Sequence, residues 1–338
     1  MSHGARLAIL LAVFLAGLLG VVAVALFLGS AQLGPSTVLR VLLGGGDTGS
    51  TERVVVWSLR LPRIVAAAVA GGALAVAGAG FQALTRNPLA EPSVLGVSSG
   101  AAFGVVIAQL VGTGVGLADA LRLTLFGFVG AFMAGVAVYL IASMGGGLPV
   151  HTLLLAGVIV GIFFASAITV LTSLVDINRL GGIVHWLLGN ISAIPPASLA
   201  LFGLLTALGS WLVLGRAREL NVLALGEEAA LQLGIDAERL KLRVFVGAAL
   251  LTAGVVAFAG PIGFVGLVVP HMLRMLLGPD NRVLIPTALL GGGIFLLVAD
   301  TVARNLISPA ELSVGVITSF CGAPFFIYLL RARTRPAT

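Results

Sequence analysis

Cysteine, lysine and charged residues in general are scarce in this sequence. Cys321 is the only cysteine, which excludes a disulfide bond within the chain. Lys241 is the only lysine, and it belongs to no phosphate-binding loop of the G-x-x-x-x-G-K-[ST] type. Charged residues make up 9% of the chain, whereas a soluble domain contains roughly 25%. The sequence therefore excludes an ordinary water-soluble core.

Hydrophobic residues are abundant instead and form 59% of the chain. They occur in blocks that are long enough to cross roughly 30 Å of hydrocarbon as helices. Many of the 46 glycines lie inside these blocks, and small residues allow membrane helices to approach one another closely. The composition predicts an all-α, polytopic membrane protein with a single transmembrane domain over residues 1–338.

Ten membrane-spanning helices are predicted from the apolar blocks. The first block, Leu7 to Gly29, lacks a small-residue cleavage site and is interpreted as a membrane helix rather than a signal peptide. Gly260 and Pro261 divide one long apolar stretch into two spans. The predicted ranges are 7–29, 64–84, 93–116, 123–144, 153–175, 197–214, 244–259, 262–277, 283–303 and 314–330.

The basic residues orient these spans. An even number of spans places both termini on one side of the membrane, where the loops then hold twelve basic residues against seven on the other side. Because basic residues collect in cytoplasmic loops, both termini are predicted to be cytoplasmic. The same bias explains the net charge of +6, so membrane lipid is the expected contact and no nucleic-acid partner is predicted.

Charged side chains are missing from the centres of the predicted spans. A secondary transporter driven by protons or sodium usually holds an ionisable or unwound site near mid-membrane. A stand-alone secondary transporter or channel is therefore the weaker alternative, and uphill transport would need energy from another polypeptide. A membrane receptor or scaffold without transport is a third alternative. The glycine- and proline-interrupted stretches 87–104 and 259–278 favour a transporter over that scaffold.

The longest polar insertion lies between the sixth and seventh predicted spans, at about 216–243. Within it, Glu227–Leu233 consists of strong helix formers bounded by Gly226 and Gly234, which predicts a helix of about two turns. Its acidic start suits the helix dipole. Such a helix could simply lie at the membrane interface, or it could dock into a cytoplasmic motor.

A series of motifs in order resembles the FecCD-type permeases, subunits of type II ABC importers for ferric siderophores, heme and cobalamin. Any single motif is weak, but the ordered set is specific and runs along nearly the whole chain. Ser313 is a departure, because the family usually has proline there. The motifs are Leu59–Arg63 (LRLPR), Gly78–Gly100 (GAGFQALTRNPLAEPSVLGVSSG), Trp186–Gly189, Leu225–Gly226 with Leu233–Gly234, Ala259–Leu267 followed by Pro270–His271, Asp300 with Arg304, Glu311–Gly315 and Gly322–Phe326.

This resemblance implies a homodimer of ten-helix subunits with one pathway at the two-fold axis, in a bacterial inner membrane. It also implies two cytoplasmic ATPase subunits, which bind ATP and Mg, and a periplasmic substrate-binding protein. The chain itself is then a transport subunit and not an enzyme, with no cofactor or metal site of its own. The implied cargo is heme or a ferric siderophore, with cobalamin ranked behind them.

The resemblance also assigns roles to individual residues. Arg60 and Arg304 are expected to dock acidic residues of the binding protein. Contact with lipid headgroups or helix capping is the alternative for these arginines and, apart from the resemblance, the preferred role for Arg63. The cytoplasmic gate is expected at Asn87, Pro88 and Leu89 and at Val150 and His151. A tight turn in which Asn87 satisfies backbone groups is the alternative for the first segment, and it is compatible with a gating role. Coupling to the ATPase is expected at Leu225, Gly226, Glu227, Ala230, Leu233 and Gly234.

Overall fold

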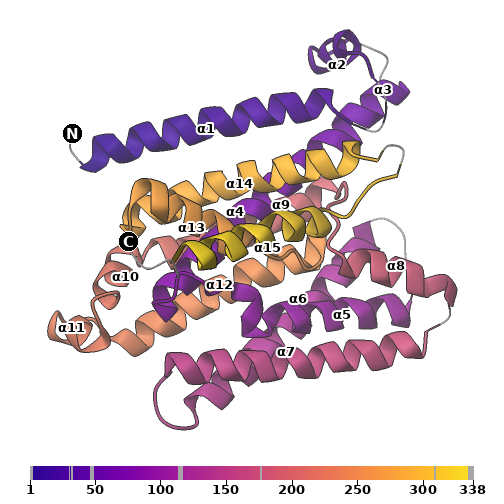
Figure 1. Cartoon of the computed structure of the whole chain (residues 1–338). Coiled ribbons are helices and arrows are strands. Elements are labelled where there is room, and N and C mark those ends of the chain that lie inside the picture. The colour runs from indigo at the N-terminus through magenta and orange to yellow at the C-terminus, as the bar shows by residue number, and fades with distance from the viewer. Residues whose placement is uncertain are drawn as a thin grey trace.

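The chain folds into a bundle of helices that run side by side (Figure 1). The computed structural model describes residues 3–29, 31, 33–45, 49–112, 117–175, 177–307 and 310–333. Within these ranges the β-structure is limited to one isolated bridge between Ile307 and Ala310. The structure thus confirms the predicted class of an all-α polytopic membrane protein.

Seven helical segments of the described chain are long and apolar enough to cross a membrane, and three shorter apolar helices accompany them. Together they overlap the ten predicted ranges. The long segments belong to α1 (His3–Phe27), α4 (Leu61–Thr85) with the turns before it, α6 (Leu117–Ser143), α7 (Val150–Ser173), α9 (Pro196–Leu214), α12 (Ala237–Ala259) and α14 (Asn281–Asn305). The shorter helices are α5 (Val97–Val111), α13 (Val265–Leu277) and α15 (Val314–Arg333).

Two helix starts differ from the prediction for local reasons, and one helix was not predicted. The short α3 (Thr51–Arg53) and the π-helix η1 (Val54–Arg60) run directly into α4, so this helix begins at 51 rather than 64. Helix α12 begins at Ala237 rather than 244, because the Asp236 side chain caps it by accepting from the Arg239 backbone N–H at 3.0 Å. A helix that was not predicted, α8 (Ile177–Leu187), lies in the stretch expected to be a loop.

Helix α4 forms the centre of the bundle and is buried along most of its length. It packs against α9, α12, α13 and α14. Glycines make this close packing possible: a Cβ atom added to Gly78 would overlap the backbone carbonyl of Gly266, and one added to Gly71 would overlap that of Gly292. Van der Waals contact between backbones therefore replaces side-chain interdigitation at these crossings.

Helices α5 and α13 both begin inside the bundle, which shortens the predicted spans 93–116 and 262–277. Before α5, the 3-10 helix η2 (Pro92–Leu95) ends at Gly96, which has a φ of 73° and packs against Gly157 of α7. Before α13, Phe264 has a φ of 69°. The Glu91 carboxylate accepts from the Phe264 N–H at 2.7 Å and so satisfies a backbone group at the start of α13.

The two ends of the bundle differ. Both chain termini lie at the end that carries α10 (Ala217–Leu223) and α11 (Glu227–Gln232), hereafter the α11 end (Figure 1). Helices α2 (Pro35–Leu42), α3 and α8 lie at the opposite end, hereafter the α8 end (Figure 1). The residues predicted to dock the binding protein and those predicted to couple to the ATPase are therefore separated by the length of the bundle.

Candidate functional site

At the α8 end, five charged side chains form the arginine cluster: Arg60, Arg63, Asp300, Arg304 and Glu311. Arg60 comes from η1, Arg63 from α4, Asp300 and Arg304 from α14, and Glu311 from the segment before α15. The cluster contains three arginines and two carboxylates, so it has an excess of one positive charge. Together with residues of neighbouring segments, Arg60, Arg63, Arg304 and Glu311 line an open cavity of about 340 Å³.

The two arginines expected to dock a partner are both almost fully buried. Arg60 is 4% exposed and donates from Nη1 to the Leu26 carbonyl at 2.6 Å and from Nη2 to the Ala31 carbonyl. It therefore caps the end of α1. Arg304 is 3% exposed, and its Nε lies 3.1 Å from Oδ2 of Asp300. The Arg304 Nη2 group has no hydrogen-bond partner among the described residues. The docking role of both arginines stays a prediction.

Arg63 does not have the role expected for it. Its guanidinium donates to Asp300 Oδ1 from Nε at 3.2 Å and from Nη2 at 3.0 Å, and to Glu311 Oε2 from Nη1 at 2.7 Å. The prediction that Arg63 contacts lipid headgroups or caps a helix is therefore wrong. The physical reason is the fully buried Asp300 carboxylate, which requires a cationic partner.

The first predicted gate segment follows α4 at the α11 end. Arg86 ends the helix in the left-handed region, with a φ of 52°. The Asn87 side chain then accepts from the Leu89 backbone N–H at 2.9 Å, which closes a tight turn around Pro88. The structure thus shows the turn, and the gating role of Asn87, Pro88 and Leu89 stays a prediction.

The second predicted gate segment starts α7, where Val150 is the first helical residue and His151 is exposed. Leu148 lies two positions before Val150, and both of its backbone groups form hydrogen bonds with side chains of α12. Its N–H donates to Glu238 Oε2 at 2.5 Å, and its carbonyl accepts from Lys241 Nζ at 3.0 Å. The start of α7 is therefore attached to the first turns of α12.

The predicted coupling segment folds as a capped helix. Helix α11 lies between Gly226, with a φ of 125°, and Gly234, with a φ of 77°. The Ile235 N–H donates to the Ala230 carbonyl at 2.9 Å, which is the closing bond of a Schellman motif. Ala230 is buried, while Leu225 and Leu233 are 75% and 66% exposed. The helix is anchored on one side and presents leucines on the other.

Lys241 joins these elements, a role that the sequence analysis missed. Its Nζ lies 3.1 Å from Glu227 Oε2 on α11 and 2.5 Å from Glu238 Oε1 on α12. Glu227 is also 3.7 Å from the Arg86 guanidinium. The available signal was a single lysine three residues after a glutamate, which favours a local pair on one helix. The pairing with residue 227 depends on tertiary structure.

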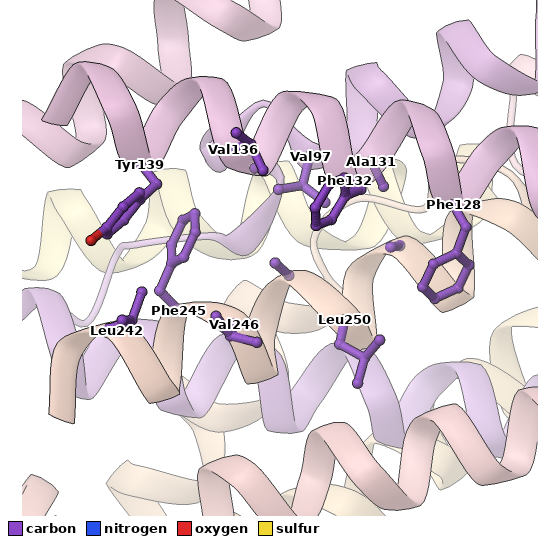
Figure 2. Close-up of a pocket in the computed structure, with 13 residues that line it drawn as sticks. Val97, Phe128, Ala131, Phe132, Val136, Tyr139, Leu242, Phe245, Val246 and Leu250 are labelled. Atoms are coloured by element: carbon purple, nitrogen blue, oxygen red, sulfur yellow. The ribbon is translucent and has the colours of Figure 1, made fainter. Parts of the chain in front are cut away.

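An apolar cavity of about 290 Å³ lies between α6 and α12 (Figure 2). Phe128, Phe132 and Tyr139 project toward it from α6, and Leu242 and Phe245 from α12. The Tyr139 hydroxyl is the one polar side-chain group in its lining. Such a surface suits hydrocarbon, and it offers few partners to a large polar chelate.

Comparison with known proteins identifies the family. The FecCD transport family matches residues 10–332. The cobalamin import system permease protein of Halobacterium salinarum is 44% identical over 84% of this chain and 75% of its own length. The hemin transport system permease protein of Yersinia pestis is 38% identical, over 93% of this chain and 94% of its own.

A solved structure shares the fold. It is described as an inward-facing conformation of a metal-chelate type ABC transporter, with a TM-score of 0.80 and 30% identity, and the match covers 96% of this chain and 99% of that one. An ABC importer permease works with an ATPase and a binding protein and is not itself catalytic. The chain belongs to the FecCD transport family and is the permease subunit of an ABC importer for an iron chelate or cobalamin.

Proposed function

We propose that the protein is the homodimeric permease of an importer that carries heme from a periplasmic binding protein to the cytoplasm. A ferric siderophore is the next candidate for the cargo. The bundle sits in a bacterial inner membrane with its α11 end and both termini in the cytoplasm. The single observation that carries the choice of heme is the 38% identity to the hemin permease along 94% of that protein. The cobalamin permease of Halobacterium is matched along 75% of its length.

Cobalamin is the third candidate, although the Halobacterium permease has the higher identity of the two relatives, 44%. Both cargoes are large, rigid metal chelates, so one weakly polar pathway at a dimer axis suits either of them. Selectivity then rests largely with the binding protein that delivers the cargo.

The α8 end is the proposed docking face for that binding protein. The arginine cluster has an excess positive charge and an open cavity, and Arg304 Nη2 is buried without a hydrogen-bond partner among the described residues. A partner carboxylate that enters this cavity would gain a charge-assisted hydrogen bond. Charge pairing of this kind sets the orientation and the association rate of a partner more than its affinity.

The α11 end is the proposed contact for two ATPase subunits, which bind ATP and Mg. Leu225, Leu231 and Leu233 are each more than half exposed around α11, and apolar side chains gathered in a polar segment mark an interaction surface. The segments that begin at Asn87 and Val150 would form the gate near the dimer axis.

Reconstituted transport tests this function. Proteoliposomes would contain this chain, its ATPase and its binding protein, with and without internal ATP, and heme, a ferric siderophore and cobalamin would be supplied separately. We expect heme to accumulate only when ATP is present inside. Accumulation of the ferric siderophore alone, or of cobalamin alone, would make that compound the cargo in place of heme. Accumulation without ATP would contradict an ATP-driven importer and favour a secondary transporter.

A further inference from the structure

We infer that Lys241, Glu227 and Glu238, hereafter the Lys241 clamp, transmit movement of the coupling helix α11 to the start of α7. The inference rests on the proposed function, in which α11 contacts the ATPase and α7 begins at the gate. Lys241 is the positioning residue of the clamp. Glu227 holds it to α11, and Lys241 and Glu238 each bind one backbone group of Leu148.

The burial of Lys241 is the first observation. Its side chain is 2% exposed, and a buried ammonium group is costly unless it is paired and hydrogen-bonded. An ammonium group has three donors. They meet three acceptors here, the Leu148 carbonyl, Glu227 Oε2 and Glu238 Oε1, at 3.0, 3.1 and 2.5 Å. Because each of its three donors has an acceptor, Lys241 connects α11, α12 and the segment before α7 at one point.

The attachment of α7 is the second observation. Leu148 is bonded through its N–H to Glu238 and through its carbonyl to Lys241. Pro149 follows and caps α7, with its carbonyl accepting from the Leu153 N–H at 2.9 Å. Because proline fixes its own φ, a shift of Leu148 is passed to Val150 and the first turn of α7.

Glu227 supplies the link to the other gate segment. It is the first residue of α11, and it lies between Lys241 at 3.1 Å and Arg86 at 3.7 Å. Arg86 immediately precedes Asn87 at the end of α4. One carboxylate on the coupling helix therefore contacts cations that hold both predicted gate segments.

The geometry of α11 makes it able to act as a unit. Its last turn is closed by the Schellman bond to Ala230, and Ala230 itself is buried against the bundle. When an ATPase moves the exposed leucines, Glu227 moves with the helix. If the ion pairs from Glu227 to Lys241 and Arg86 persist, the gate segments move with α11. If they break, the gate segments stay in place, so the network has two distinct arrangements.

Replacement of Lys241 in the full complex tests this inference. In Lys241→Met, we expect ATP hydrolysis to continue while the amount of cargo moved per ATP falls about tenfold. Lys241→Arg keeps the charge and should recover part of that ratio. The matched control is Arg239→Met, which removes a cation from the same turn of α12. The Arg239 side chain is 79% exposed, and within the described structure it is paired only with the nearby Asp236. The control should keep the wild-type ratio.

Glu227→Gln provides a second, milder variant, because Glu238 still compensates Lys241 in it. It should also lower the ratio, because it weakens the contacts of α11 to both Lys241 and Arg86. An unchanged ratio in both single variants would overturn the inference and leave the proposed function intact. A wild-type complex without ATP-driven uptake would overturn the proposed function and this inference with it.

Discussion

At the residue scale, the carboxylate of Asp300 governs the arginine cluster. It is fully buried and lies 3.0 Å from Arg63 and 3.1 Å from Arg304. Removing a carboxylate from water costs several kcal/mol, and an ion pair offsets this cost only with good geometry and further hydrogen bonds. Arg63 supplies two such bonds to Asp300 and a third to Glu311.

Arg63→Met should therefore destabilise the protein strongly. Loss of one partner of a buried pair costs roughly 3–5 kcal/mol, whereas Arg239→Met, which breaks an exposed pair, should cost about 1 kcal/mol or less. Thermal unfolding of the detergent-solubilised protein, followed by size-exclusion chromatography, measures the difference. Equal stability of both single variants would contradict this role of Arg63.

The sequence allowed only part of this cluster to be predicted. Asp300 and Arg304 are four residues apart on one helix, and such pairs follow from helix geometry alone. Arg60 and Arg63 also occur in one recognisable motif. Which of them reaches Asp300, more than two hundred residues away in the chain, depends on how α4 crosses α14, and no local pattern specifies that crossing.

At the element scale, the glycines of α4 determine how closely its neighbours approach. Gly78→Ala would place a methyl group on the Gly266 backbone carbonyl, and overpacking of this kind costs about 1–3 kcal/mol. The matched control is Gly20→Ala in α1, where an added Cβ meets no atom within 4 Å. We expect a lower unfolding temperature for Gly78→Ala and no decrease for Gly20→Ala. A Gly78→Ala protein as stable as the control would show that α4 and α13 can separate without loss.

The presence of each membrane helix was easier to predict than the residues at which it begins and ends. Long apolar blocks identify membrane helices because the hydrocarbon core sets their length. The late starts of α5 and α13 were missed, since they depend on Gly96 packing on α7 and on Glu91 capping Phe264. Helix α8 was missed because eleven residues are too few to register as a span.

At the scale of the whole molecule, the two ends of the bundle present surfaces of different chemistry. The α8 end has a cavity with excess positive charge, and the α11 end has exposed leucines around a capped helix. The order of these features along the chain was predictable from the motifs. Their separation by the full length of the bundle is a property of the fold, and it allows two partners to bind at once.

Arg304→Gln should weaken docking of the binding protein. A partner carboxylate would lose its buried donor, which costs roughly 2–5 kcal/mol. The concentration of binding protein that half-maximally stimulates ATP hydrolysis measures the effect, and basal hydrolysis controls for assembly. Arg40→Gln, on an exposed residue of α2 at the same end, should leave the stimulation unchanged. Equal stimulation of both variants would contradict docking at the cavity.

The short helices α5 and α13 also bear on how the protein is made. They contain 15 and 13 residues and are about 22 Å and 20 Å long at 1.5 Å per residue, which is less than the roughly 30 Å of the hydrocarbon core. Neither can be a stable lipid-exposed span by itself as it leaves the ribosome. Helix α5 packs on α6, which follows it, and α13 packs on α14 and α4. We therefore expect α5 to enter the bilayer together with α6, whereas α13 can pack on α4, which has already been inserted.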